Sequence, residues 1–571
     1  MQLKRFALFT IAIFIIAVCA QASTRPAPKP YTIMIYMNGS DLESDFGAAT
    51  TDLVEILDSG LDSRNANVVI LTGGTNRWQN AVIPAGDCII WEVADGFLYE
   101  GTNMGKVSMG DPATLREFIR YGIQHFPAEK YGLIMWDHGG GSIAGFGHDE
   151  KFNDASLTLH DMMLAFEEAG LRENKLEFLG FDACLMATVE MAIIAADYAH
   201  VMIASEDLEP GDGWDYVFLS ALNTDPQMSG FTLGRHIVDT FMDFYGPNSD
   251  ELLSLSVIDL AHIKPVMTTM GHLMTQASSS IKSQEDPSFQ ELAFRRGITK
   301  TFGEGSPRDN YSDMVDIGDM AVLLEDLYPR EAKAVLRALN RCVVYNRHNS
   351  DIELYGLSTF YIYGGKSEGV HSLRTYSDLN MDNEYTAYLH HFFNNLVNRK
   401  SRNDLPPVRS ELVLWQPLTQ NRYRMAGLLQ TTPANDLLWP KLNGIPISLY
   451  PIATTAQNRL YAAPAQINGR EGDLIIVFNN RHPQGHIKGI RYNDGHVIQK
   501  GHDPIEPGDK IALYALEWNF DKDTKEKNWH KSEVFTVTNQ LSLTWATAPK
   551  TYRLGYRHTD ICNDVKYTTP F

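Results

Sequence analysis

The sequence predicts an α/β fold, a mostly parallel sheet sandwiched by helices, followed by a β-rich C-terminal domain. Two observations carry this prediction. Up to about residue 400, short apolar runs alternate with stretches of helical spacing, which is the pattern of strand–helix–strand units. From residue 407 onward, helical spacing is nearly absent and short strands bounded by turn residues replace it. With 571 residues, the chain is long enough for several domains.

Five short apolar runs are predicted to be strands of the sheet: 31–37, 67–72, 131–136, 176–181 and 200–204. Helical spacing occupies the intervals between them, over 44–58, 111–125, 157–169 and 186–198. Strands that are apolar on both faces are typical of a parallel sheet covered by helices on both sides. Helical segments then dominate residues 233–346, and 354–363 predicts one more strand of the same sheet.

Beyond residue 407 the short strands include 474–478, 510–515, 532–537 and 541–545. Asn468-Gly469 and Asn493-Asp494-Gly495 are turn sequences suited to β-hairpins. We therefore assign residues 31–400 to one α/β domain and residues 407–571 to a β-sandwich-like domain.

The N-terminus predicts export. Two basic residues precede an apolar run that ends in a small-x-small cleavage site at Ala22, so residues 1–22 are predicted to be a signal peptide. The mature protein is then secreted or periplasmic, and residues 23–30 are a proline-rich leader. Cys19 leaves a lipid anchor open as an alternative. No later stretch reaches the roughly 18 apolar residues of a transmembrane helix, so none is predicted.

Charge and cysteine content narrow the function classes. The formal net charge is −21, and such a field repels polyanions, so we do not expect a nucleic acid partner. Five cysteines in 571 residues are too few for a disulfide scaffold.

Candidate catalytic residues follow the third and fourth predicted strands. His138 stands just after one strand and Cys184 just after the other, and neighbouring strand ends of a parallel sheet share one edge. A nucleophilic cysteine needs a base to favour its thiolate, and His138 can supply it. The backbone N–H groups of Gly139 and Cys184 are the candidate oxyanion donors, since glycine permits close approach.

Asp182-Ala183-Cys184-Leu185-Met186-Ala187, together with Trp136-Asp137-His138-Gly139, resembles the clostripain family of cysteine peptidases, which has a caspase-like fold. Other stretches that are similar to that family are 36–43, 206–214 and 356–359. The resemblance covers residues 31–400. It implies a His138/Cys184 dyad, and protein or peptide substrates with Arg or Lys on the amino side of the cleaved bond.

Acidic residues near the cysteine agree with a basic substrate side chain. Asp182 lies two residues before Cys184, so on an extended strand both project to one side, and a carboxylate there suits Arg or Lys. The alternative for Asp182 is a helix cap. Glu206 and Asp207 follow the next predicted strand and are expected to add negative charge to the same pocket.

Self-processing is a further expectation. Lys151 is the only basic Lys or Arg residue in a polar, weakly structured loop over 145–155, and exposed polar loops are preferred cleavage sites. Members of the resembled family are processed in this interval. A cut after Lys151 would leave a light chain of about 129 residues, from Ser23 to Lys151. Arg172 and Lys175 are the fallback sites.

Two other functions stay open. The segment from His138 to Gly141 also matches the oxyanion motif of some esterases, and Gly365-Lys366-Ser367-Glu368-Gly369 matches their nucleophile motif. However, Lys366 and Glu368 indicate a solvated loop rather than a tight elbow, and 370–378 is a poor amphipathic helix. The second alternative is a catalytically inert surface-binding protein whose β-rich region is the functional half.

No cofactor is required by the dyad. Asp313, Asp316 and Asp319 form an acidic strip that predicts a solvated helix face, and no metal ligand set is assigned. Some members of the resembled family use calcium, so the resemblance leaves calcium open.

Overall fold

The computed structural model describes residues 27–571, except 247–248, 283–286, 304–312, 364–368, 382, 398–406, 419–420, 429, 432–436, 493–499, 521–527, 540 and 548–551. The predicted signal peptide, Cys19 and the junction near residue 400 therefore lie outside the described residues. Of the helices in the described ranges, none has the length and apolarity needed to cross a membrane.

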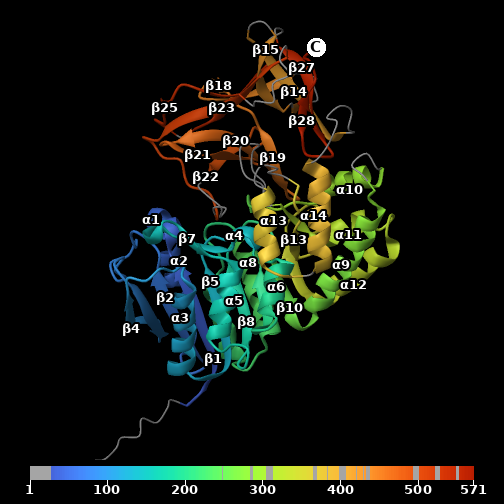
Figure 1. Cartoon of the computed structure of the whole chain (residues 1–571). Coiled ribbons are helices and arrows are strands. Elements are labelled where there is room, and N and C mark those ends of the chain that lie inside the picture. The colour runs from blue at the N-terminus through green and yellow to red at the C-terminus, as the bar shows by residue number, and fades with distance from the viewer. Residues whose placement is uncertain are drawn as a thin grey trace, which may run out of the picture.

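The N-terminal part of the chain forms an α/β body around one sheet. Its strands are β1 (Lys29–Asn38), β2 (Ala66–Gly73), β3 (Cys88–Ala94), β4 (Phe97–Gly105), β5 (Ala128–Trp136), β8 (Leu176–Asp182), β9 (Ala199–Ala204), β10 (Ser254–Asp259) and β12 (Val343–His348). They lie in the order β12-β10-β9-β8-β5-β1-β2-β3-β4 (Figure 1). The five central strands, from β9 to β2, are parallel, as predicted.

The edges of the sheet differ from the sequence expectation. β3 and β4 add an antiparallel hairpin at one edge, and β10 and β12 are antiparallel at the other. The prediction that 354–363 belongs to this sheet is wrong: β13 (Ser358–Phe360) pairs with β11 (Met314–Asp316) in a small separate sheet and makes one isolated bridge, to Thr188. Short strands with one partner carry too weak a pattern to show which sheet they join.

Helices cover both faces of the sheet. The longer ones are α1 (Ser40–Phe46), α2 (Ala48–Asp58), α3 (Pro112–His125), α5 (Leu159–Glu168), α6 (Val189–Ala195), α8 (Gly230–Tyr245), α9 (Ile263–Ser280), α10 (Pro287–Ile298), α11 (Ile317–Leu323), α12 (Pro329–Cys342), α13 (Gly369–Asp378) and α14 (Asn383–Val397). The helix predicted over 44–58 is two helices, since Gly47 between them has a φ of +70° and ends the first.

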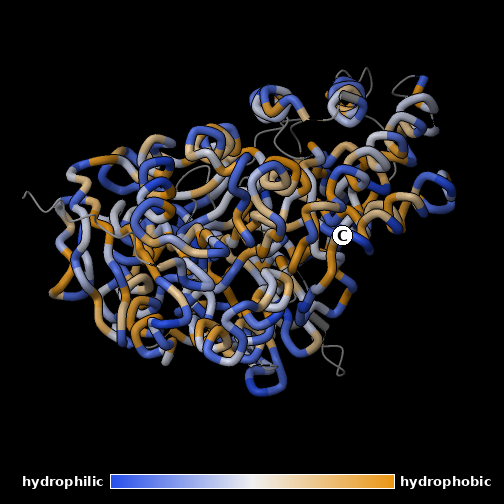
Figure 2. The backbone as a smooth tube through the Cα atoms, turned by 90° about the horizontal axis from the view of Figure 1, so that it is seen from below, coloured by the Kyte–Doolittle hydropathy of each residue, from blue (hydrophilic) through white to orange (hydrophobic). Residues whose placement is uncertain are grey.

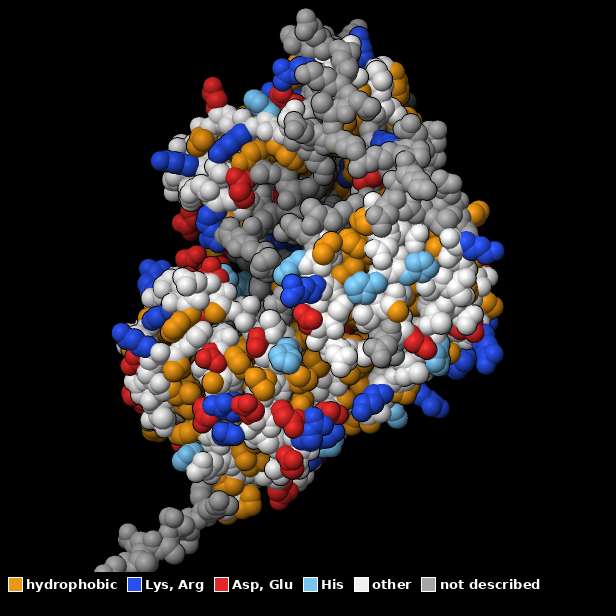
Figure 3. All heavy atoms as spheres, in the orientation of Figure 1, with side chains coloured by type: hydrophobic (Ala, Val, Ile, Leu, Met, Phe, Trp, Pro, Cys, Tyr) orange, Lys and Arg blue, Asp and Glu red, His pale blue; other side chains and the backbone are white. Residues whose placement is uncertain are grey.

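Two buried clusters lie on the two faces. Successive residues of β1 alternate between them: Met34 and Tyr36 join one cluster, Ile33 and Ile35 the other. This alternation follows from the period of two of a strand. Figure 2 shows hydrophobic stretches running through the body of the molecule, with hydrophilic loops at its lower edge. On the face in Figure 3, acidic and basic side chains are interspersed over the α/β body.

The C-terminal part is β-rich, as predicted, and lies above the α/β body in Figure 1. Its strands are β14 (Pro407–Pro417), β15 (Arg422–Leu428), β16 (Gln430–Thr431), β17 (Leu437–Leu442), β18 (Ile445–Pro446), β19 (Tyr450–Thr454), β20 (Arg459–Ile467), β21 (Arg470–Phe478), β22 (His486–Tyr492), β23 (Lys510–Asn519), β24 (Asn528–Lys531), β25 (Phe535–Thr536), β26 (Leu543–Thr547), β27 (Arg553–Asp560) and β28 (Val565–Tyr567). Asn468 and Gly469 join β20 to β21 with φ values of +51° and +95°, which confirms that hairpin. The second turn sequence, at 493–495, lies outside the described residues.

Candidate active site

The site lies at the carboxyl edge of the central parallel strands. Trp136 at the end of β5 is in register with Asp182 at the end of β8, so His138 and Cys184 each follow by two residues. A Cβ on Gly139 would stand 1.9 Å from the carbonyl oxygen of Cys184. Only glycine therefore allows the two segments to approach this closely. The structure brings together the two residues that the sequence selected as nucleophile and base.

Both ring nitrogens of His138 have partners. Nε2 lies 2.8 Å from Oδ1 of Asp41, and Nδ1 accepts the backbone N–H of Lys500 at 2.9 Å. Burial lowers the pKa of His138, but the charge and hydrogen bond of Asp41 more than offset this, so the pKa is raised. Because an accepting Nδ1 carries no proton, the Lys500 amide contacts the neutral ring, whose proton sits on Nε2 facing Asp41.

The thiol of Cys184 is completely buried. Its Sγ accepts the backbone N–H of Glu209 at 3.2 Å and lies 3.8 Å from the carbonyl oxygen of the same residue. Burial raises the pKa of Cys184 to about 12, so the thiol is protonated in this arrangement. Among the described residues, no hydrogen bond joins it to His138.

The two candidate oxyanion donors are unengaged. Within the described ranges, neither the amide of Gly139 nor that of Cys184 donates a hydrogen bond to the protein. Leu185, directly after the cysteine, has a φ of +63° and donates its N–H to the carbonyl of Asp207. This turn leaves the preceding amide free for a ligand oxygen.

Beside Cys184, a closed pocket contains the side chain of Lys500 from the β-rich region. Its ammonium Nζ pairs with Oδ1 of Asp182, lies 3.2 Å from the Asp182 carbonyl oxygen, and lies 3.6 Å from Oε2 of Glu209. It also stands 5.6 Å from the ring centroid of Trp136. Only 1% of Lys500 is exposed, so the pocket encloses a whole basic side chain.

Aromatic groups position the pocket carboxylates. Oδ2 of Asp182 accepts the backbone N–H of Trp214 and the hydroxyl of Tyr216, each at 3.2 Å. Gly213 closes one wall, since a Cβ there would lie 2.6 Å from Asp182 Oδ1 and 2.9 Å from Lys500 Nζ. The pocket therefore fits a long basic side chain and holds the carboxylate of Asp182 beside the terminal ammonium.

The pocket holds three acidic side chains, Asp52, Asp182 and Glu209, around one ammonium. Asp52, bonded to the Trp136 indole, is also buried there, and burial with the nearby Asp182 raises its pKa well above the usual range. Burial likewise raises the pKa of Glu209, against the opposing effect of Lys500. Burial alone would lower the pKa of Lys500, but Asp182 and Glu209 more than offset it and raise that pKa, which keeps the ammonium protonated.

Glu206 and Asp207, the other predicted pocket residues, lie elsewhere. Asp207 pairs with Lys300 at 3.6 Å and accepts the N–H of Gly303. Glu206 is buried beside Asp316, and burial first, then that carboxylate, raise its pKa well above the usual range. In the described chain neither contacts the Lys500 ammonium. The acidic residue that reaches the pocket is instead Glu209, two to three residues later in the loop after β9.

The prediction that Asp313, Asp316 and Asp319 form a solvated helix face is wrong. Asp313 pairs with Arg296 at 3.3 Å, Asp316 caps α11, and Asp319 accepts the N–H of Lys300. These carboxylates are committed to protein donors rather than solvated, so the strip does not fit a calcium site. In the part of the chain that the structure describes, no group of three metal-binding side chains is found.

Lys151 lies at the tip of a small hairpin between β6 (Phe146–Asp149) and β7 (Ala155–Leu157). The loop is thus more ordered than expected: Lys151 sits in a short 3-10 turn, exposed, with its N–H on Asp149 and its ammonium on the Ala85 carbonyl. His148, in β6, lies edge-on against His138, with 6.0 Å between the ring centroids. The hairpin therefore starts next to the site.

The esterase alternative is only partly covered by the described residues, because 365–368 of its nucleophile motif lie outside them. Gly141 begins the short helix α4 (Gly141–Ala144), and Ser367 lies outside the described residues. Contrary to expectation, α13 forms a regular helix from Gly369 to Asp378, with Leu373 and Tyr376 buried.

Four residues of the site had no assigned role from the sequence: Asp41, Asp52, Glu209 and Lys500. Asp41 and Glu209 stand in stretches that resemble the family, so a signal existed for both. Asp52 was one acidic residue in a predicted helix. Lys500 is 362 residues from the histidine it contacts, and nothing local distinguishes it from other lysines.

Comparisons with known proteins identify the family of this chain. A family model described as the clostripain family matches residues 35–400. Clostripain from Hathewaya histolytica is 23% identical over 410 residues, which are 60% of this chain and 77% of that protein.

Solved structures with a similar fold include a secreted C11 cysteine protease from Bacteroides thetaiotaomicron in complex with an irreversible peptide inhibitor. Its TM-score is 0.46 at 16% identity, covering 62% of this chain and 100% of that chain. An inactive zymogen C11 protease from Parabacteroides distasonis has a TM-score of 0.45 at 18% identity, covering 62% of this chain and 95% of that chain. Because the family model spans well over half of the sequence, the chain belongs to the clostripain family and is a cysteine endopeptidase.

Proposed function

We propose that the protein is a secreted endopeptidase that cleaves after Arg or Lys, with Cys184 as nucleophile and His138 as general base and acid. The observation that carries the specificity is the pocket beside Cys184, which encloses a lysine ammonium between Asp182 and Glu209. Buried carboxylates of this kind favour a cation over any neutral side chain.

In the proposed reaction, His138 takes the thiol proton and the Cys184 sulfur attacks the carbonyl carbon of the basic residue. The oxyanion is held by the N–H groups of Gly139 and Cys184. The carbon–nitrogen bond then breaks, His138 protonates the leaving amine, and water hydrolyses the thioester. With Nε2 held by Asp41, Nδ1 is the ring nitrogen that moves the proton.

Self-cleavage after Lys151 belongs to the same proposal. The exposed hairpin tip and its basic residue support it, and the turn must open before the chain can enter the site in extended form. Export through the N-terminal signal, with Cys19 as the lipidation alternative, is proposed from sequence alone. No cofactor is part of the proposed reaction. Assaying the enzyme with and without a calcium chelator tests for calcium dependence.

The direct test uses fluorogenic peptides that differ only in the residue before the cleaved bond: Arg, Lys, norleucine or Asp. Because Lys500 fills the pocket, the wild-type chain and Lys500→Ala are both assayed. We expect hydrolysis of the Arg and Lys peptides alone, and a loss of about 10⁴-fold or more in Cys184→Ala. Cys342→Ala, another buried free thiol, is the control and should stay active. Equal hydrolysis of the norleucine peptide, or an active Cys184→Ala, would contradict the proposal.

A further inference from the structure

The segment Lys500–Gly501 enters the active site from the β-rich region and contacts His138, Asp182 and Glu209. The side chain of Lys500 fills the pocket, its amide contacts His138, and the amide of Gly501 donates to the carbonyl of Glu209 at 3.2 Å. We propose that the β-rich C-terminal region is an intramolecular inhibitor that presents Lys500 as a substrate mimic in a non-cleavable orientation. This inference rests on the proposed preference for basic residues.

The orientation of the backbone separates an inhibitor from a substrate. To cut after a residue in the pocket, the general acid must protonate the nitrogen of the following residue, which is the nitrogen that leaves. Here the leaving nitrogen would belong to Gly501, and it faces Glu209 instead. The nitrogen that contacts His138 is that of Lys500 itself. The Lys500–Gly501 bond is therefore held with the wrong nitrogen at the base.

Glycine at 501 is required for this fit. Gly501 has a φ of +74°, and a Cβ there would stand 2.6 Å from both the Cα and the N of Gly211. Two glycines thus pack backbone to backbone at the pocket entrance. Any side chain at 501 meets both a disfavoured conformation and a collision with backbone.

Charged contacts outside the pocket hold the two regions together. Asp250 and Glu251 of the α/β body face three basic side chains of the β-rich region: His486 lies 3.3 Å from Asp250, and Lys488 and His502 lie 3.2 and 3.3 Å from Glu251. Burial raises the pKa of Glu251, but His502 and Lys488 more than offset it and lower it to about 2. This carboxylate is thus ionised and paired.

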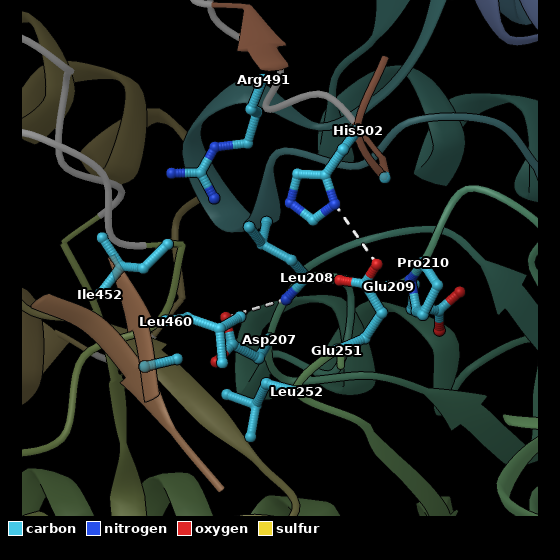
Figure 4. Close-up of a pocket in the computed structure, with 12 residues that line it drawn as sticks. Asp207, Leu208, Glu209, Pro210, Glu251, Leu252, Ile452, Leu460, Arg491 and His502 are labelled. Carbon is cyan, nitrogen blue, oxygen red and sulfur yellow. Dashed lines mark hydrogen bonds and ion pairs between the residues drawn. The ribbon is translucent and has the colours of Figure 1, made fainter. Parts of the chain in front are cut away.

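Figure 4 shows the interface next to the pocket. His502 and Arg491 from the β-rich region and Glu209 and Pro210 from the α/β body line a small cavity that Gly501 borders. Leu460 and Ile452 from β20 and β19 close it from the other side. The path along which a substrate would leave the pocket is therefore covered by the β-rich region.

The test measures how fast a peptide chloromethyl ketone ending in lysine alkylates Cys184, followed by intact mass. We compare the full-length wild type with Lys500→Ala and Gly501→Ala, and with Lys510→Ala, an exposed lysine on β23, as the matched control. Lys500→Ala empties the pocket, whereas Gly501→Ala displaces the segment without changing charge. We expect both to be alkylated at least tenfold faster than wild type, and Lys510→Ala to match wild type. Equal rates of Cys184 alkylation in all four proteins would overturn the proposal that the β-rich region is an inhibitor.

A second readout does not depend on activity. In the wild type, an amine-acetylating reagent should modify Lys510 while Lys500 stays protected, and Gly501→Ala should remove that protection. Acetylation of Lys500 as fast as Lys510 in the wild type would overturn the proposal even if Gly501→Ala misfolds. If Lys500 stays protected from acetylation and Cys184 is alkylated in none of the variants, the proposed function is wrong. The proposed inhibition is then wrong as well. A wild-type fragment that ends at Lys500 and is absent from Cys184→Ala would show productive cleavage and refute the orientation.

Discussion

Two lysines, one on a hairpin next to the active site and one inside its pocket, lie in opposite surroundings. Lys151 is exposed at the tip of a hairpin that contacts His138 through His148, and its ammonium donates to the backbone carbonyl of Ala85. Lys500 comes from another region of the chain and is buried between Asp182 and Glu209. A polar, accessible loop therefore presents a lysine to other proteins, whereas occupancy of the pocket depends on buried counter-charges assembled by tertiary structure.

Of the substitutions that test this contrast between the two lysines, Asp182→Asn is expected to have the largest effect. Replacing the carboxylate removes a charge-assisted contact of about 1.5–3 kcal/mol, so the ratio of kcat/KM between Lys and norleucine peptides should fall about 10- to 150-fold. The same change should make Lys500 reactive toward acetylation while leaving Lys151 as reactive as before. Glu206→Gln is the control, because Glu206 lies outside the contacts of the ammonium, and its ratio should not change. An unaltered ratio in Asp182→Asn would remove Asp182 from the pocket.

A smaller effect is expected from Asp41→Asn, which changes the surroundings of His138 and leaves the pocket around Lys500 unchanged. Asp41 raises the pKa of His138, so its loss should lower that pKa, and the imidazolium of the dyad should be lost at lower pH. The alkaline limb of the pH profile of kcat/KM should therefore move to lower pH, with a rate loss of about tenfold. Discrimination between Lys and norleucine should be kept. Asp45→Asn, an exposed position on the same helix, should behave as wild type; a profile of Asp41→Asn that coincides with it would show that Asp41 does not set the ring's titration.

The smallest effect is expected from Lys151→Ala. A surface substitution of this kind changes stability by no more than about 0.5 kcal/mol, and Lys500 should remain protected. Intact mass should show that the light chain of about 129 residues no longer forms. If that fragment persists, processing occurs at another residue, and Arg172 and Lys175 are the next to substitute.

The α/β body could be predicted because its pattern is local. The five parallel strands are short apolar runs, and β5 and β8 each end two residues before a chemically distinctive side chain. The edge strands could not be assigned, since β10 and β12 are antiparallel additions whose partners lie far along the sequence. For the same reason β13 was placed in the wrong sheet.

Within the site, His138 and Cys184 were accessible to sequence reasoning because neighbouring parallel strands end at one edge. Asp182 could be chosen by the alternation of a strand, but Glu206 and Asp207 could not be separated from Glu209. That choice depends on how the loop after β9 turns. Asp41 reaches His138 from the other side of the sheet's edge, through the Gly39–Ser40 turn after β1, which no periodicity describes.

The distance in sequence between His138 and Lys500 also has a consequence in time. A chain is made from its N-terminus, and at about 5–20 residues per second the roughly 100 residues from the end of α14 at Val397 to Lys500 take about 5–20 s to synthesise. During that interval the α/β body can fold with Asp52, Asp182 and Glu209 in its pocket and no lysine to neutralise them. Burying these carboxyl groups without a cation is unfavourable, so the pocket would stay open to water until the last third of the chain arrives. The order in which the polypeptide emerges therefore gives the nascent enzyme a brief period in which a foreign basic side chain, or its own Lys151, can reach the pocket first.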